Sequence, residues 1–194
     1  MKLCGLTGGV GMGKSTAAGF FLAHGARIID TDELARQLVQ PGQPALGEIR
    51  REFGADILTA AGELNRAELA RRVFADVAAR KKLEAILHPR IRESWLAQVE
   101  QWRREDRPLA IVVIPLLFET QAEVYFQKII CVACSPAAQR ERLSARGWSP
   151  EQISQRIAAQ WPVEPKIARS QFVLWTEGEK QSTERQVAQV FQRL

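Results

Sequence analysis

Cysteine is scarce in this chain of 194 residues, and long apolar runs are absent. The three cysteines are an odd number, which argues against a disulfide framework. No apolar run approaches the roughly 18 to 20 residues of a membrane span, and the N-terminus lacks the charged and apolar regions of a signal peptide. We therefore expect a protein that stays in the cytoplasm and has no membrane partner.

A basic stretch interleaved with aromatic residues, which is typical of nucleic-acid binders, is also missing. The net charge of +5 would suit nucleic acid or a polyanionic small molecule, but the arginines are spread along the chain. A slightly basic, solvated surface explains them as well. With 46% apolar and 25% charged residues, the composition is that of an ordinary globular domain. We expect no nucleic-acid partner.

Two of the cysteines, Cys131 and Cys134, have the C-x-x-C spacing of zinc and redox sites. No second Cys or His pair lies nearby in the sequence, and both residues fall in the apolar run KIICVAC. Because such a run is typical of a buried strand, we predict that these cysteines belong to the core.

The segment GGVGMGKST, from Gly8 to Thr16, carries the clearest functional signal. The residues that fill its pattern G-x-x-x-x-G-K-[ST] are Gly8, Gly13, Lys14 and Ser15. Glycine lets backbone N–H groups approach phosphate oxygens closely. Lys14 adds a charge near the β- and γ-phosphates, and Ser15 offers a hydroxyl to Mg²⁺. The segment therefore predicts a site for a nucleoside triphosphate.

The flanking sequence supports this interpretation. A short apolar run, Lys2 to Thr7, predicts a strand entering the loop, and Lys14 to His24 predicts a buried helix leaving it. The N-terminal dipole of that helix would face the phosphates. A Gly-rich turn without a ligand is the alternative, and this context disfavours it.

Apolar runs alternate with helical patterns along the chain, which predicts an α/β fold with a parallel five-stranded sheet flanked by helices. The predicted strands are Lys2 to Thr7, Ala26 to Asp30, Leu109 to Ile114, Lys128 to Cys134 and Phe172 to Trp175. Between the second and third strands, Glu33 to Arg107 is mostly helical and too long for a simple crossover, so it should form a lobe. There is no internal repeat.

Local signals divide the helical regions. Turns are expected at Pro41-Gly42-Gln43-Pro44, Ala61-Gly62 and His88-Pro89, and Asn65 with Glu68 should start a helix through Phe74. Ser135-Pro136 and Ser149-Pro150 each place an N-cap before a proline. They predict two helices, about 136 to 146 and 150 to 160, and Glu179 to Phe191 predicts a last amphipathic helix.

Carboxylates follow the second strand at Asp30 and Asp32. In open α/β sheets ligands gather at the carboxyl ends of strands, so either could accept a hydroxyl proton or help to hold Mg²⁺. A helix N-cap is the alternative for each. The third strand ends in Pro115, where many phosphate-loop NTPases have an Asp, and Glu119 just beyond it is as consistent with a surface carboxylate as with a functional one.

Basic residues form two further candidate sets. Arg140, Arg142 and Arg146 follow the fourth strand, where they could stabilise charge on a transferred phosphoryl group or simply form an exposed face. His88, next to a proline and before Arg92, could bind an anionic substrate, although a lone His there is more typical of a turn.

The sequence resembles the dephospho-coenzyme A kinases nearly end to end. The motifs that carry the resemblance are LTGGVGMGKST (6–16), IDTD (29–32) followed by LARQLVQPGQPAL, FG (53–54), G-x-L-x-R (62–66), LHP-x-I (87–91), PLLFE (115–119) and SP-x-x-Q-x-x-R-L-x-x-R (135–146). The resemblance implies a nucleoside-monophosphate-kinase-like P-loop fold with a core, a helical substrate-binding domain and a lid. It also implies transfer of the γ-phosphoryl group of ATP to the ribose 3′-hydroxyl of dephospho-coenzyme A.

Site roles are likewise implied by the resemblance. Asp32 would be the base, with Lys14 and Arg140 as its catalytic partners, and Ser15 would bind Mg²⁺. ATP would contact Gly9, Gly11, Met12, Gly13, Lys14, Ser15, Thr16, Arg142 and Arg146. The acceptor would contact Asp32, Arg66, His88, Arg92 and Glu119. The core would comprise residues 1–32, 108–135 and 170–194, the lobe about 33–107 and the lid about 136–169.

Departures from the family pattern gather near the C-terminus. Ser170-Gln171 replaces an Ala-Asp pair, Trp175-Thr176 replaces Asp-Asn, and Ala133 stands where an Asp is frequent. In that family the last strand leads to the loop near the adenine, so these changes bear on base recognition.

Two other functions remain open from the sequence. The chain could be a kinase of the same architecture for another nucleotide or nucleoside, or a nucleotide-dependent RNA-binding protein, which would show salt-sensitive binding. We expect a monomer or a small homo-oligomer.

Overall fold

Five parallel strands form one sheet in the computed structural model, which describes residues 1–194. The strands are β1 (Lys2–Thr7), β2 (Arg27–Asp30), β3 (Leu109–Val113), β4 (Lys128–Ala133) and β5 (Phe172–Trp175), in the order β2-β3-β1-β4-β5. Leu6 of β1 lies opposite Val113 of β3 and Ile130 of β4. The carboxyl ends of these strands therefore meet at one edge of the sheet. The predicted parallel α/β sheet is confirmed.

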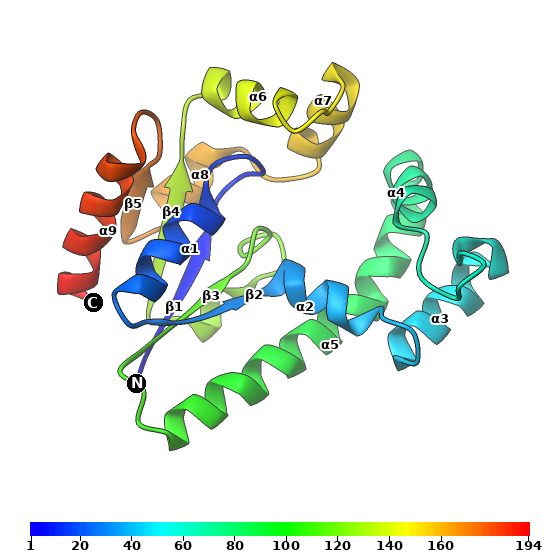
Figure 1. Cartoon of the computed structure of the whole chain (residues 1–194), viewed down its shortest axis with the longest axis horizontal. Helices are drawn as coiled ribbons and strands as arrows, with labels where there is room; N and C mark the ends of the chain where they lie inside the picture. The colour runs from blue at the N-terminus through cyan, green and yellow to red at the C-terminus, as the bar shows by residue number, and fades with distance from the viewer. The chain divides into compact units, whose positions relative to one another are not determined.

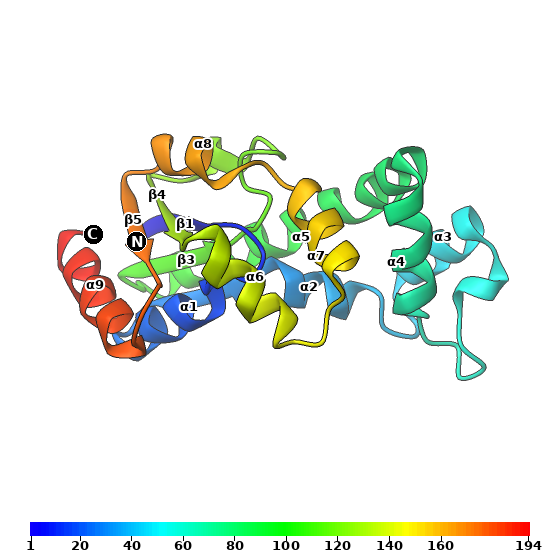
Figure 2. The ribbon, with the colours of Figure 1, turned by 90° about the horizontal axis from the view of Figure 1, so that it is seen from above.

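Helices cover both faces of this sheet (Figure 2). On one face lie α1 (Lys14–Ala23) and α9 (Lys180–Arg193), and on the other lies α8 (Val163–Ala168). The first pair contributes Phe21 and Val187 to a buried cluster that also contains Leu6 and Ile111 of the sheet. Every residue of β3 is buried, as expected for a strand covered on both faces.

The three cysteines are free and buried, so the prediction that Cys131 and Cys134 are core residues is confirmed. Burial raises the pKa of the Cys4 and Cys131 thiols to about 11 and also raises the pKa of Cys134. Because the thiolate is the reactive and metal-binding form, these thiols are chemically inert near neutral pH.

The predicted helices after β4 are present as α6 (Pro136–Ser144) and α7 (Pro150–Ala158). Their starts agree with the sequence signals, since Ser135 and Ser149 accept hydrogen bonds from backbone N–H groups of the first turn. Each helix ends two residues earlier than predicted. A short 3-10 helix, η2 (Ala122–Tyr125), and α8 were not predicted.

The chain divides into two compact units, residues 1–30 with 102–194, and residues 31–101. The second unit contains α2 (Thr31–Leu38), α3 (Pro44–Phe53), η1 (Ala55–Ile57), α4 (Arg66–Ala75) and most of α5 (Val77–Arg104). Its own core is built around Val39, Ile49, Ile57 and Leu69. Residues 31–101 are thus mostly helical, while the division into core, substrate-binding lobe and lid stays a prediction. Asn65 caps α4 by accepting from the Glu68 N–H. Separate motion of the lid segment, about 136–169, stays a prediction.

The predicted turn at His88-Pro89 is wrong, because α5 continues through it as one helix (Figure 1). A proline inside a helix removes one backbone hydrogen bond and costs about 3 kcal/mol. Packing of Leu83, Ile86 and Leu87 against the core of the second unit outweighs this cost. The side chain of Arg90 also donates to the Ile86 carbonyl at 2.6 Å, close to the interruption.

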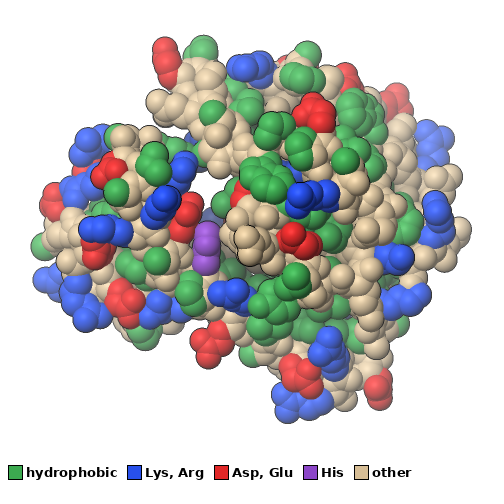
Figure 3. All heavy atoms as spheres, turned by 180° about the vertical axis from the view of Figure 1, so that it is seen from behind, with side chains coloured by type: hydrophobic (Ala, Val, Ile, Leu, Met, Phe, Trp, Pro, Cys, Tyr) green, Lys and Arg blue, Asp and Glu red, His purple; other side chains and the backbone are tan.

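The surface carries mixed charge. On the face seen in Figure 3, Lys and Arg side chains lie among Asp and Glu side chains and do not gather in one basic patch. None of the helices is both long and apolar enough to cross a membrane.

Candidate active site

The loop after β1 opens directly onto the N-terminus of α1. Gly8 has φ 144°, and a Cβ at this position would lie 2.2 Å from the Val132 carbonyl oxygen of β4. Gly13, the N-cap of α1, is left-handed with φ 91°, and the first turn has neither an acidic residue nor a side-chain cap. A helix N-terminus of this kind presents N–H groups and positive dipole to an anion.

Lys14 adds a full positive charge at the same place. Its Nζ donates to the carbonyl oxygens of Gly8 and Gly9, each at 2.9 Å, so the ammonium lies across the loop. Ser15 and Thr16 follow in the first turn of α1 and are exposed. The motif therefore has the geometry of a phosphate loop, with a cation, two hydroxyls and a helix N-terminus together.

Helix α6 gives the loop glycines a second role. A Cβ on Gly9 would lie 3.1 Å from Gln139 Nε2, and a Cβ on Gly11 would lie 2.9 Å from Leu143 Cγ. Met12 is 4% exposed, and its Sδ accepts from the Gly9 N–H at 3.3 Å. Close approach to phosphate and positive φ were the reasons predicted for the loop glycines, and the packing of α6 against Gly9 and Gly11 is a further one.

Thr176, at the end of β5, connects this loop to the lid segment. Its Oγ1 lies 2.9 Å from the Met12 carbonyl and 3.3 Å from the Ala133 carbonyl, to which it can donate. The same oxygen accepts from Arg142 Nη1 at 2.9 Å, and Arg142 Nη2 donates to the Thr176 carbonyl. Of the predicted lid arginines, Arg142 is therefore the one held at the loop.

The other two arginines are placed differently. Arg140 is exposed on α6, and Arg146 is exposed beyond its end. Arg142 and Arg146 do not belong to one helix, because α6 ends at Ser144.

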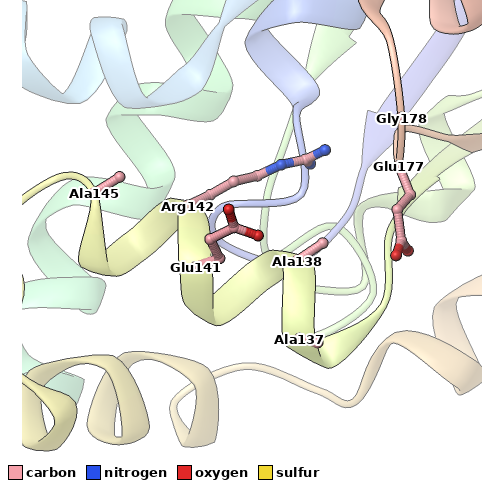
Figure 4. Close-up of a pocket in the computed structure, with 7 residues that line it drawn as sticks. All are labelled: Ala137, Ala138, Glu141, Arg142, Ala145, Glu177 and Gly178. Carbon is pink, nitrogen blue, oxygen red and sulfur yellow. The ribbon is translucent and has the colours of Figure 1, made fainter.

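A pocket of about 390 Å³ lies between α6 and the loop before α9 (Figure 4). It is lined by Ala137, Ala138, Glu141, Arg142, Ala145, Glu177 and Gly178. Alanine methyl groups form its apolar part, and charged groups rise from the helix and the loop. Glu177 accepts from the Ser135 backbone N–H at 3.0 Å, a hydrogen bond that lowers the pKa of its carboxyl and keeps it ionised.

A buried ion pair follows β3. Lys166 of α8 is 0% exposed, and its Nζ donates to Glu119 Oε1 at 2.7 Å and to the Pro115 carbonyl at 2.8 Å. Glu119 Oε1 also accepts from the Trp161 N–H at 2.8 Å, while its buried Oε2 has no hydrogen-bond partner. Lys166 was not predicted as a site residue, since nothing in VEPKIA distinguishes a buried lysine from an exposed one.

Asp30 and Asp32 lie on either side of the boundary between the two units. Asp30 ends β2 opposite Val113 of β3, at the same sheet edge as the phosphate loop. Asp32 is exposed in the first turn of α2. Two residues of extended chain span at most about 7 Å, so Asp32 stays close to the end of β2.

The remaining predicted residues belong to the second unit. His88 and Arg92 are one helical turn apart on α5, and Arg92 is exposed. Burial lowers the pKa of His88, with Glu84 opposing and Arg92 adding to the shift, so the imidazole is neutral at pH 7. Arg66, at the start of α4, is exposed and donates to the Arg36 carbonyl at 3.4 Å. Nowhere do three or more His, Cys, Asp or Glu side chains form a metal-binding group.

Comparisons with known proteins agree on one family. A family model described as dephospho-CoA kinase matches residues 2–182. A dephospho-CoA kinase from Bdellovibrio bacteriovorus is 41% identical over 194 residues, covering 100% of this chain and 96% of the relative. One from Anaeromyxobacter dehalogenans is 44% identical over 179 residues, covering 92% and 85%.

Among solved structures, a dephospho-CoA kinase from Campylobacter jejuni has a TM-score of 0.72 at 24% identity, covering 100% of this chain and 97% of that one. This likeness supports the same fold. The sequence matches span nearly the whole chain and include the phosphate loop. The chain therefore belongs to the dephospho-CoA kinase family, whose members use ATP to phosphorylate dephospho-CoA in the last step of coenzyme A synthesis.

Proposed function

We propose that the phosphate loop holds ATP and that Asp32 serves as the base for transfer of its γ-phosphoryl group to the ribose 3′-hydroxyl of dephospho-CoA. The observation that carries this proposal is the loop itself, which leads into an N-terminus of α1 without a side-chain cap and with Lys14 beside it. The proposed ATP contacts are Gly9, Gly11, Met12, Gly13, Lys14, Ser15 and Thr16.

Mg²⁺ fits the same place. The Ser15 hydroxyl is a hard oxygen ligand in the exposed first turn of α1. In the phosphate-loop motif the Ser/Thr hydroxyl is a ligand of Mg²⁺, and phosphate oxygens and water complete most of the remaining shell. When bound, the ion would neutralise charge on the phosphates.

In the proposed step, the acceptor oxygen forms a bond to the γ-phosphorus while the bond to the bridging oxygen breaks and ADP leaves. The hydroxyl proton passes to the Asp32 carboxylate. Lys14, with Arg140, Arg142 and Arg146 of the lid segment, would stabilise the charge on the transferred group. Exclusion of water by the lid would limit hydrolysis of ATP.

For the acceptor, we propose contacts with Arg66, His88, Arg92 and Glu119. Neutral His88 can donate through one ring nitrogen and accept through the other. The two arginines suit the phosphates of dephospho-CoA. Glu119 uses Oε1 for Lys166 and Trp161, so its proposed contact with the acceptor would involve Oε2, which is buried and has no hydrogen-bond partner.

We also propose a cytoplasmic location and a monomer or small homo-oligomer. Three free cysteines suit a reducing compartment. Light scattering of the purified protein measures the oligomeric state.

Asp32→Asn tests the base. Loss of a general base should lower kcat about 10²- to 10⁴-fold and leave the Kd of ATP unchanged. ADP release and the mass of the acceptor product report turnover. Glu33→Gln is the matched control, because Glu33 is exposed in the same turn of α2. Normal turnover of Asp32→Asn would remove Asp32 from this role, and loss in Asp30→Asn instead would assign the role to Asp30.

A further inference from the structure

Two glutamine side chains hold Val10, a residue of the phosphate loop, from two directions. The Val10 N–H donates to Gln160 Oε1 at 2.8 Å, and the Val10 carbonyl accepts from Gln139 Nε2 at 2.7 Å. Gln139 comes from α6 and Gln160 from the segment just after α7. We propose that Gln139 and Gln160 are positioning residues that clamp the phosphate loop in its ATP-binding shape and couple it to α7.

Gln139 is a fixed side of this clamp. It is 5% exposed, and its neighbours on α6 also contact the phosphate-loop region, Leu143 against Gly11 and Arg142 through Thr176. The side chain of Gln139 also approaches Gly9 so closely that a Cβ there would be 3.1 Å from Nε2. The helix therefore holds its amide in one position against the loop.

Gln160 is held by the residue that follows it. The Trp161 N–H donates to Glu119 Oε1 at 2.8 Å, and Glu119 is paired with fully buried Lys166. Trp161 also stacks on Phe118, with ring centroids 6.5 Å apart and planes at 10°. The segment just after α7 is thus attached both to the segment that follows β3 and to the phosphate loop. Any displacement of this segment changes the hydrogen bond to Val10.

The hydrogen bonds to Val10 should affect ATP binding because of where Val10 lies in the loop. Glycine stands on both sides of it, at Gly9 and Gly11, and Gly11 has φ 77°. Glycine has the largest backbone freedom of any residue, so the loop has little stiffness of its own here. The two side-chain bonds fix the peptide groups on either side of Val10, and these set the direction of the following N–H groups. The inference rests on the proposed binding of ATP by this loop.

The donor and acceptor roles predict opposite responses to Gln→Glu. Gln160 only accepts, so the carboxylate introduced by Gln160→Glu keeps the bond from the Val10 N–H. Gln139 only donates, so Gln139→Glu loses its bond and places two acceptors together. Both changes add one negative charge beside the same residue, so their difference isolates the hydrogen bond from the charge. Gln155→Glu and Gln155→Ala are matched controls, because Gln155 is an exposed residue of α7.

The experiment measures the Kd of ATP with Mg²⁺ by calorimetry, kcat and KM for each variant, and melting temperature as a check of folding. We expect Gln160→Ala to raise the Kd of ATP about 3- to 10-fold, as for one neutral hydrogen bond. Gln160→Glu should recover most of this loss, and Gln139→Glu should weaken ATP by about 10-fold or more. In all variants kcat at saturating ATP should change less than the Kd.

Equal Kd values for Gln160→Ala and the unaltered protein would overturn the clamp, and so would equal losses in the two Glu variants. If Gln139→Glu does not fold, the comparison of Gln160→Ala with Gln160→Glu decides alone. A loss confined to melting temperature would also overturn the proposal, because it would indicate a merely structural role. Failure of the unaltered protein to bind ATP would instead overturn the proposed function, and the clamp with it.

Discussion

Removal of the Lys166 side-chain charge should strongly lower the unfolding free energy of the first unit. Lys166 is fully buried, and its Nζ makes two short contacts, 2.7 Å to Glu119 and 2.8 Å to the Pro115 carbonyl. In Lys166→Met both are lost, while the stem of the side chain is replaced by one of similar volume. The Glu119 carboxylate keeps only the Trp161 N–H, and its Oε2 already has no partner.

The expected loss follows from the burial of the remaining charge. Breaking a buried ion pair by removing one partner costs about 3–5 kcal/mol, because an uncompensated charge stays out of water. The Glu119 side chain is 14% exposed, so little screening by solvent relieves it. Replacing both partners should be far milder, so Lys166→Met combined with Glu119→Gln should recover most of the loss.

The assay is equilibrium urea unfolding followed by tryptophan fluorescence, to which Trp161 beside Glu119 contributes. Lys82→Met is the matched control, since Lys82 forms an ion pair of 2.6 Å with Glu52 whose side chains are 61% and 37% exposed. An exposed pair contributes about 0–1 kcal/mol. A loss below about 1 kcal/mol for Lys166→Met, or a double variant no more stable than the single one, would refute the reasoning.

Three further predictions concern single sites. Gly8→Ala should abolish ATP binding, because the added Cβ would lie 2.2 Å from the Val132 carbonyl oxygen. Gly19→Ala is the control and should leave the Kd of ATP unchanged, because an added Cβ there would have no atom within 4 Å. Burial keeps the pKa of His88 below 6.5 in the folded state, so the unfolded chain takes up the proton first. The free energy of unfolding should therefore decrease as pH falls from about 6.5 toward the folded pKa. Urea unfolding between pH 7.5 and 5 should show a smaller decrease for His88→Gln. Thr176→Val should cost about 1–3 kcal/mol of unfolding free energy, since it leaves buried hydrogen-bonding groups unpaired, and Thr176→Ser should recover most of it.

Much of the fold could be predicted from local sequence. All five strands were found because apolar runs buried on both faces stand out, and the starts of α4, α6 and α7 follow from their capping residues. The prediction failed at Pro89, where local preference opposed the packing of α5. It also missed α8, which has six residues and no capping side chain.

The candidate site also has a part that could be predicted from the sequence and a part that could not. The phosphate loop is one continuous segment with its own pattern, so the sequence identified it. The contacts around it are long-range, as between Val10 and Gln160, which are 150 residues apart in the chain. The glutamine pair, the contacts of Thr176 and the Lys166 ion pair depend on such separations, and no local pattern of polar residues reveals which of them meet.

The C-terminal residues that the resemblance marks as departures make specific contacts of their own. Gln171 Oε1 accepts from the Ile129 N–H at 2.8 Å, and Ser170 Oγ donates to the Lys166 carbonyl at 2.7 Å. Both backbone groups of Trp175 are hydrogen-bonded to the side chain of Gln186, at 2.9 and 2.8 Å.

The Thr176 hydroxyl lies among the Met12 and Ala133 carbonyls and the guanidinium of Arg142, so three segments meet at one small side chain. An asparagine in place of Thr176 would be larger and would have to fit beside Gly13, where an added Cβ would already lie 3.1 Å from Thr176 Oγ1. Through Thr176 the strand end supports both the phosphate loop and Arg142, so its effect on ATP should be sought in the phosphate contacts as well as at the pocket beside Glu177.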